Sequence, residues 1–129
     1  MLGNLGAAYH RQGEPSRAIE YYQQALSALR EMCNRQGEGA VLCNLGSAYG
    51  DLGETQRAIE YYEQALAITR EIGDRRGEAN SLFNMGLALD KLGNSRGAIQ
   101  HAQGALAIYE QIEDPNAAQV RKQLEAWKG

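Results

Sequence analysis

Apolar residues recur along most of the chain at spacings of three and four positions, which is the pattern of an amphipathic helix. Short turns rich in glycine and polar residues separate these segments. The pattern therefore predicts seven helices and no strand, with approximate limits at 1–12, 15–32, 36–52, 55–72, 76–92, 95–113 and 115–128.

The helical segments belong to a sequence repeat with a period of 40 residues. The six residues at 57–62 are identical to those at 17–22, and the segment at 44–49 closely resembles the one at 4–9. Aligned without gaps from Asn4, the first two blocks agree at 22 of 40 positions and the last two at 13 of 40. This agreement indicates duplication of a unit of two helices.

Residues that end and begin helices recur at matching places. A glycine follows the first helix of each block, at 13, 53 and 93, where a positive φ ends a helix at little cost. Pro15 lies in the first turn of the next helix, where its missing N–H costs no hydrogen bond. The side chains expected to cap helix N-termini are those of Asn34, Asp74, Asn94 and Asp114.

Three further glycines, Gly6, Gly46 and Gly86, lie inside the predicted first helices. Glycine in a helix interior costs roughly 1 kcal/mol relative to alanine. Its return in every block therefore indicates a packing gain, namely close approach of the second helix. The residues expected to face these glycines are Ala18, Ala58 and Ala98.

Together these positions resemble the tetratricopeptide repeat. In the second block, the residues that carry the resemblance are Leu45, Gly46, Tyr49, Gly53, Ala58, Tyr62 and Ala65. The period exceeds the usual repeat of about 34 residues and is similar to that of Pins-type adaptors and bacterial signalling arrays. The third block departs from the pattern, because Leu89 and Ala102 replace two tyrosines.

The resemblance implies an all-α fold: a right-handed α-solenoid of three helix-turn-helix repeats plus a C-terminal capping helix. Residues 1–129 are then a single domain, with repeats at approximately 1–33, 34–73 and 74–113 and the capping helix at 114–129. An apolar stripe opposite a charged face marks the capping helix. The stripe consists of Ala117, Val120, Leu124 and Trp127.

Composition argues against several classes of function. The net charge is −3, from 13 Lys and Arg against 16 Asp and Glu, so the clustered basic surface that binds nucleic acid is not expected. No apolar run approaches the roughly 20 residues that span a bilayer, and no secretory signal opens the chain. We therefore expect a cytoplasmic protein without membrane contact, in which both cysteines are free thiols.

Groups that could carry catalysis or bind a metal are sparse. The glycines recur 40 residues apart instead of clustering as in a phosphate-binding loop. His10 and His101 lie in different predicted helices, with no partner at metal or triad spacing. The sequence thus predicts no enzyme activity, no metal and no cofactor.

The candidate binding residues are three asparagines, Asn4, Asn44 and Asn84, at the same place in successive first helices. The resemblance implies that first helices line a concave face. A side-chain amide both donates and accepts hydrogen bonds, so it pairs with the backbone of an extended peptide of any sequence. The alternative is that each asparagine bonds the neighbouring repeat or water and maintains the repeat geometry.

Neighbouring positions on the first helices are expected to complete the groove and to provide selectivity. The wall is predicted to be small near Ala7 and apolar near Phe83 and Leu87. The lysine-based carboxylate clamp of chaperone-binding relatives is absent, because Gly3, Cys43 and Phe83 stand in its place. The full set of peptide-binding candidates is Asn4, Asn44, Asn84, Ala7, Arg11, Ser47, Asp51, Phe83, Leu87 and Lys91.

The hypothesis from sequence is a non-catalytic protein-protein interaction module that binds an extended peptide or protein segment in its concave groove. The alternatives are a purely structural or regulatory end of a larger bacterial signalling protein, or a self-assembling array. Weak homo-association is expected through the N-terminal edge, because Leu2 and the apolar surface near it lack a preceding repeat. Either the chain belongs to a longer array or it begins naturally at Met1.

Overall fold

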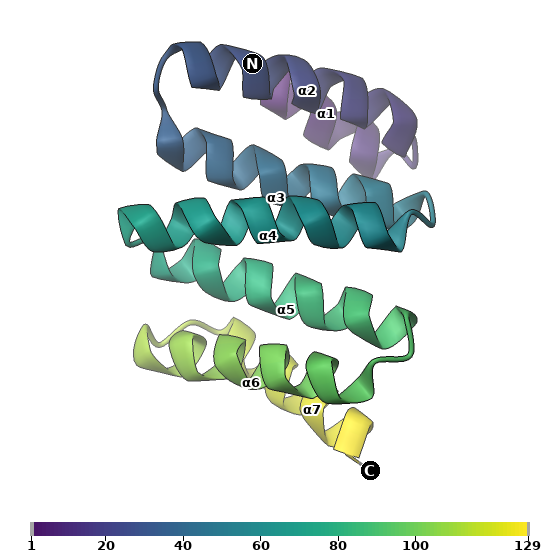
Figure 1. Cartoon of the computed structure of the whole chain (residues 1–129), viewed down its shortest axis with the longest axis vertical. Helices are drawn as coiled ribbons and strands as arrows, with labels where there is room; N and C mark the ends of the chain where they lie inside the picture. The colour runs from purple at the N-terminus through teal and green to yellow at the C-terminus, as the bar shows by residue number, and fades with distance from the viewer. Residues whose placement is uncertain (1, 129) are drawn as a thin grey trace.

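The computed structural model describes residues 2–128, and the side chains of residues 3–128. This part of the chain is helical and contains no strand. Figure 1 shows the helices stacked from α1 and α2 at the top to α6 and α7 at the bottom. Their bounds are α1 (Leu2–Arg11), α2 (Pro15–Glu31), α3 (Arg35–Asp51), α4 (Thr55–Ile72), α5 (Arg75–Lys91), α6 (Ser95–Gln111) and α7 (Asn116–Lys128).

Each helix agrees with its predicted limits to within two residues. Helices pack in consecutive pairs, α1 with α2, α3 with α4 and α5 with α6, and α7 packs against α6. The second helix of one pair also contacts the first helix of the next, while α1 touches α3 and α3 touches α5. The predicted helical solenoid is thus confirmed, and we call the side formed by α1, α3 and α5 the inner face.

None of these described helices has a stretch that is long and apolar enough to cross a bilayer.

The predicted helix ends are confirmed in detail. The side-chain oxygens of Asn34, Asp74 and Asn94 each accept a hydrogen bond from the backbone N–H three residues later, at 2.9, 3.0 and 2.9 Å. The Asp114 carboxylate accepts one from the Asn116 N–H at 2.8 Å. The glycines at 13, 53 and 93 have φ between +79° and +84°, as their place after a first helix requires.

The interior glycines pack closely against the second helices, in two cases against tyrosine rings. A Cβ on Gly6 would come within 2.7 Å of the Tyr22 ring, and one on Gly46 within 2.6 Å of the Tyr62 ring. The atoms nearest to these two glycines are therefore those of the tyrosine rings, and the approach of Ala18 and Ala58 stays a prediction.

The third helix pair, α5 and α6, packs differently around its interior glycine. Ala102 stands where the earlier blocks have tyrosine, so no ring lies over Gly86. A Cβ on Gly86 would instead meet the backbone oxygen of Ala98 at 3.0 Å. The predicted approach of Ala98 is confirmed here, because a small residue lets the two backbones come together.

Helix α7 covers α6 with an apolar stripe. Ala117, Val120 and Leu124 are buried, and Trp127 is half-buried against the core. The opposite face of α7, with Arg121, Lys122, Glu125 and Lys128, is exposed. The predicted stripe is confirmed, although Trp127 contributes less buried area than a fully enclosed aromatic side chain.

Candidate functional site

The three asparagines lie on α1, α3 and α5, the helices of the inner face. Asn4 and Asn44 are exposed, whereas Asn84 is half-buried. The Asn84 amide donates a hydrogen bond of 3.4 Å to the Cys43 sulfur on α3. Because a thiol is a weak acceptor, this contact links the two helices without strongly engaging the amide.

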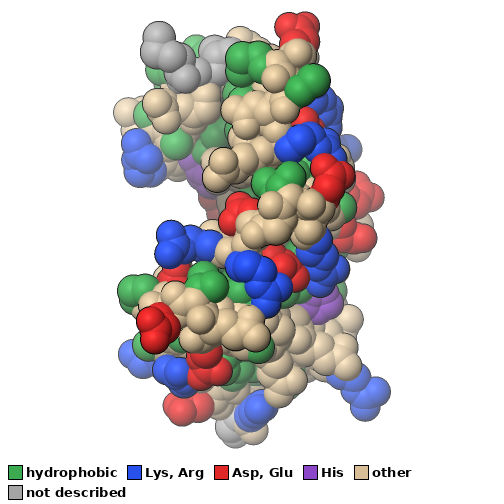
Figure 2. Space-filling view, turned by 90° about the vertical axis from the view of Figure 1, so that its left-hand side faces the viewer, with side chains coloured by type: hydrophobic (Ala, Val, Ile, Leu, Met, Phe, Trp, Pro, Cys, Tyr) green, Lys and Arg blue, Asp and Glu red, His purple; other side chains and the backbone are tan. Residues whose placement is uncertain are grey.

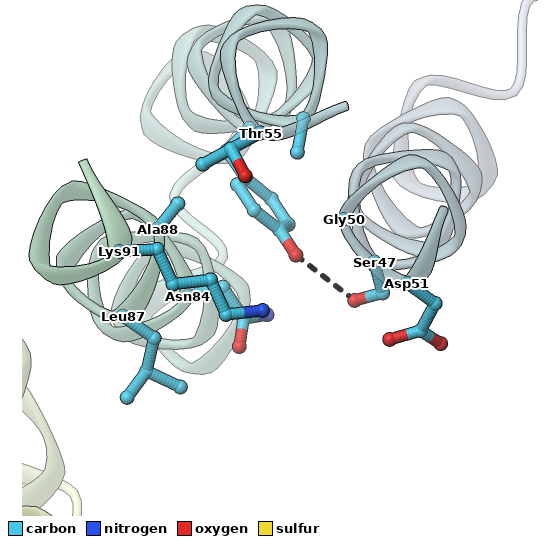
Figure 3. A pocket seen from close by; sticks show the side chains of 10 residues that line it. Ser47, Gly50, Asp51, Thr55, Asn84, Leu87, Ala88 and Lys91 are labelled. Carbon is cyan, nitrogen blue, oxygen red and sulfur yellow. Dashed lines mark hydrogen bonds between the residues drawn. The ribbon is translucent and has the colours of Figure 1, made fainter. Parts of the chain in front are cut away.

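A pocket of about 190 Å³, which we call the central pocket, lies between α3, α4 and α5. Figure 3 shows Asp51 on one side and Asn84, Leu87 and Lys91 on the other. Its lining residues are Ser47, Gly50, Asp51, Thr55, Ala58, Tyr62, Asn84, Leu87, Ala88 and Lys91. Five of the predicted binding residues are therefore together in one place.

Tyr62 supplies a polar group to the central pocket. Its ring is buried, and its hydroxyl and that of Ser47 share a hydrogen bond of 3.1 Å, drawn in Figure 3. Burial raises the pKa of Tyr62 to about 12, and the bond to Ser47 offsets only part of this rise. The phenol is consequently uncharged at neutral pH and acts as a hydrogen-bonding group.

A second pocket of about 360 Å³, the Cys43 pocket, also lies between α3 and α5 and reaches α4. It holds Asn44 among mostly small and polar side chains. Its lining residues are Gln36, Gly39, Ala40, Cys43, Asn44, Thr69, Asp74, Arg76, Gly77, Asn80 and Ser81. We call the Cys43 pocket and the central pocket together the α3–α5 groove.

The Cys43 thiol forms part of the wall of the Cys43 pocket. Burial raises the pKa of the thiol, and the hydrogen bond from the Asn84 amide lowers it less. A thiol with a raised pKa carries little thiolate, which is the nucleophilic and metal-binding form. Cys33 is exposed, and both cysteines are free, as predicted.

Asn4 lies apart from the other two asparagines. It lines a largely apolar pocket of about 390 Å³ between α1, α2 and α3. The other lining residues are Gly3, Ala25, Ala28, Leu29, Met32 and Val41. Each of the three asparagines thus lines a different pocket, and a continuous row of three amides remains a prediction.

The remaining candidates are placed on the inner-face helices but outside these pockets. Ala7 is half-buried and Arg11 is exposed on α1. Phe83 packs, half-buried, against the hydrophobic core. The apolar wall expected from Phe83 and Leu87 together is therefore reduced to Leu87, because the Phe83 ring contributes to the core.

One contact of the inner face is not predicted by the sequence pattern. The pattern gives His10 no partner, but its Nε2 contacts a carboxylate oxygen of Asp51 across the α1–α3 junction. The pair is separated by 41 residues, as are Cys43 and Asn84. A spacing of one repeat period plus one residue was thus the available signal for side-chain neighbours on this face.

The polar groups of these pockets are amides, hydroxyls and a few charged side chains. Among the described residues, no group of three or more His, Cys, Asp or Glu side chains is arranged to hold a metal ion. His101 bonds the Gly97 carbonyl of its own helix at 2.8 Å. Such polar groups suit recognition of a polar chain.

Comparison with protein families gives two matches, both to models described as tetratricopeptide repeat. They cover residues 37–111 and residues 1–29. A comparison with curated proteins finds no match.

Solved structures share the fold at low sequence identity. The apo form of RapI superposes with a TM-score of 0.92 at 22% identity, covering 98% of this chain and 47% of that one. BtubC from P. vanneervenii gives 0.86 at 21% identity, covering 98% and 52%. Aspartyl phosphate phosphatase F from Bacillus subtilis gives 0.91 at 17%, covering 95% and 33%. The chain thus spans about half the length of the RapI and BtubC chains, and 33% of the aspartyl phosphate phosphatase F chain.

Proposed function

The chain belongs to the tetratricopeptide-repeat family, and we propose that it is a non-catalytic protein-interaction module that binds an extended peptide segment along its inner face. The observation that supports this proposal is that Asn44 and Asn84 each line a pocket between α3 and α5. The space-filling view of Figure 2 shows the molecule indented at mid-height on its left-hand side.

The amides suit a ligand backbone. An amide that pairs with a peptide unit contributes roughly 0.5–1.5 kcal/mol net. Two or three such pairs give weak binding, so side-chain pockets have to supply the remaining affinity. The central pocket and the Cys43 pocket supply such space beside the two asparagines.

A regulatory part of a larger signalling protein is the second candidate. It is favoured by the coverage of 47% of RapI and 33% of aspartyl phosphate phosphatase F, whose chains extend well beyond the shared solenoid. In that case Asn84 acts mainly through its bond to Cys43, as a link between α3 and α5.

Selection from a phage-displayed library of short unstructured peptides tests the proposal. A selected peptide should bind the Asn44→Ala/Asn84→Ala variant roughly tenfold more weakly, because two backbone pairs are lost. Thermal stability should be nearly unchanged or higher, since alanine favours the helix. Fluorescence anisotropy measures the affinity and circular dichroism the melting temperature.

The matched control is Gln64→Ala/Gln103→Ala, which removes two exposed amides from α4 and α6, away from the groove. It should bind like the unchanged protein. Undiminished binding by a folded Asn44→Ala/Asn84→Ala variant would show that peptides use another surface. A marked loss of stability in that variant would favour the structural role of the asparagines.

A further inference from the structure

The repeat register pairs His10 with Gly50, since the two positions are one period apart. In the first block the imidazole of His10 is a packed side chain. Its ring lies edge-on to the Tyr22 ring, with centroids 6.4 Å apart and planes at 81°, and its Nε2 contacts Asp51. The protein thus holds a planar, polar ring at this place on the α1–α3 side of the inner face.

One period later, the same place is the central pocket. The counterparts of His10, Tyr22 and Asp51 are Gly50, Tyr62 and Lys91, and all three line that pocket. Gly50 has no side chain to fill the space that a ring occupies in the first block. The internal repeat therefore indicates the shape of a group that this pocket accepts.

The size of the pocket indicates that this group is a single side chain. Its volume of about 190 Å³ is below the roughly 300 Å³ at which sites for small-molecule ligands begin. Asn84 lines this pocket, so a side chain of a peptide held by the Asn84 amide would reach it directly.

The charges of the pocket define the polarity of the group. Asp51 and Lys91 both line it, and the carboxylate pairs with His10 on α1. Lys91 takes part in no ion pair within the part of the chain that the structure describes. An anionic side chain would pair with Lys91 but be repelled by Asp51, and a cationic one would pair with Asp51 but be repelled by Lys91, so each charged class carries a repulsive contact.

An uncharged planar group with a donor and an acceptor suits both charged residues of the pocket, Asp51 and Lys91. Such a group has a donor for the Asp51 carboxylate and an acceptor for the Lys91 ammonium. Imidazole in its neutral form and the carboxamide of glutamine or asparagine have this donor-acceptor arrangement. Tyr62 and Ser47 add hydroxyls at the side of the pocket.

We propose that the central pocket is a receptor for one uncharged, planar donor-acceptor side chain of the bound partner, a neutral histidine or a glutamine or asparagine. This assignment rests on the proposed binding of an extended peptide along the inner face.

The test uses side-chain analogues in place of a whole peptide. The acetylated methylamides of histidine, glutamine, glutamate and lysine are titrated to tens of millimolar into nitrogen-15-labelled protein at about pH 8, where imidazole is neutral. The histidine and glutamine probes should shift the amide resonances of Ser47, Leu87 and Lys91. The glutamate and lysine probes should shift them at least about threefold less, because each meets a like charge.

The Gly50→His variant installs in the second block the side chain that the first block already has. A Cβ on Gly50 would lie 3.8 Å from the Ala58 Cβ, an ordinary contact, so the helix accommodates it. Probe binding should fall at least about fivefold as the new ring fills the pocket. Gln64→His, which adds an imidazole at an exposed position on α4, is the matched control and should bind like the unchanged protein.

Lys91→Met gives an independent result if Gly50→His does not fold. Lys91 is exposed, and losing its ammonium should weaken the neutral probes about threefold or more. The assignment is overturned if glutamate binds best, if no probe shifts the pocket resonances, or if both variants bind like the unchanged protein. Library peptides that still require Asn44 and Asn84 would then leave the proposed function standing, whereas their absence would overturn both.

Discussion

Two glycines on α3, four positions apart, should respond to alanine in opposite directions. A Cβ on Gly46 would lie 2.6 Å from the Tyr62 ring, whereas one on Gly50 would lie 3.8 Å from the Ala58 Cβ. Carbon atoms in contact are normally about 3.5–4.0 Å apart, so the Tyr62 ring has to move by about 1 Å in the Gly46→Ala variant.

The buried ring cannot move freely. Tyr62 is 6% exposed and its hydroxyl is bonded to Ser47 at 3.1 Å. Overpacking of this kind costs about 1–3 kcal/mol, and straining the hydroxyl bond adds up to about 1 kcal/mol. Alanine returns roughly 1 kcal/mol through its higher helix propensity. The net expectation for Gly46→Ala is a loss of about 2 kcal/mol in the free energy of unfolding.

Gly50→Ala has the propensity gain without the clash, so it should stabilise by up to about 1 kcal/mol. Urea unfolding followed by far-ultraviolet circular dichroism measures both variants. In a Tyr62→Ala background, where the ring that a Cβ on Gly46 would meet is gone, the Gly46→Ala penalty should disappear. A stabilising effect of Gly46→Ala in the otherwise unchanged protein would refute the packing argument.

Three further outcomes are expected. Trp127→Ala should lower the free energy of unfolding by about 1–2 kcal/mol, less than the 3–5 kcal/mol or so of a fully buried aromatic, because Trp127 is half-buried. A larger loss in urea unfolding would contradict the partial burial. Burial raises the pKa of Tyr62 from 10 to about 12. The stabilising contribution of the neutral phenol is therefore complete below about pH 10 and is lost as the pH rises through about 12. The Tyr62→Phe variant should show a flatter decline in the free energy of unfolding over this range. Leu5 is 46% exposed, while its counterparts Leu45 and Met85 are 0% and 6% exposed. Weak self-association through α1 is therefore expected, and Leu5→Lys should reduce it. A strict monomer in sedimentation up to about 1 mM, which corresponds to a contact of about 4 kcal/mol, would contradict this prediction. The side chain of Leu2, part of the same expected edge, lies outside the described residues.

The helix limits and caps were predictable from sequence because their causes are local. Asn34, Asp74 and Asn94 each bond a backbone N–H three residues away, within one helical turn. The period of 40 residues likewise needed no structure, since it is visible as a repeated pattern. The local pattern places the asparagines on first helices, and the family resemblance implies that first helices line the inner face.

The contents of the groove depended on contacts between helices far apart in sequence. The atoms closest to Gly6 and Gly46 belong to the rings of Tyr22 and Tyr62, which the sequence pattern did not predict. The bond of His10 to Asp51 depends on how α1 lies against α3. By itself, the sequence determined the order, ends and repetition of the helices, because hydrogen bonds within a turn set them. Only the tertiary structure decided which side chains meet on the inner face. A small residue such as Gly50 leaves a space, and the side chains that line this space come from the neighbouring helices.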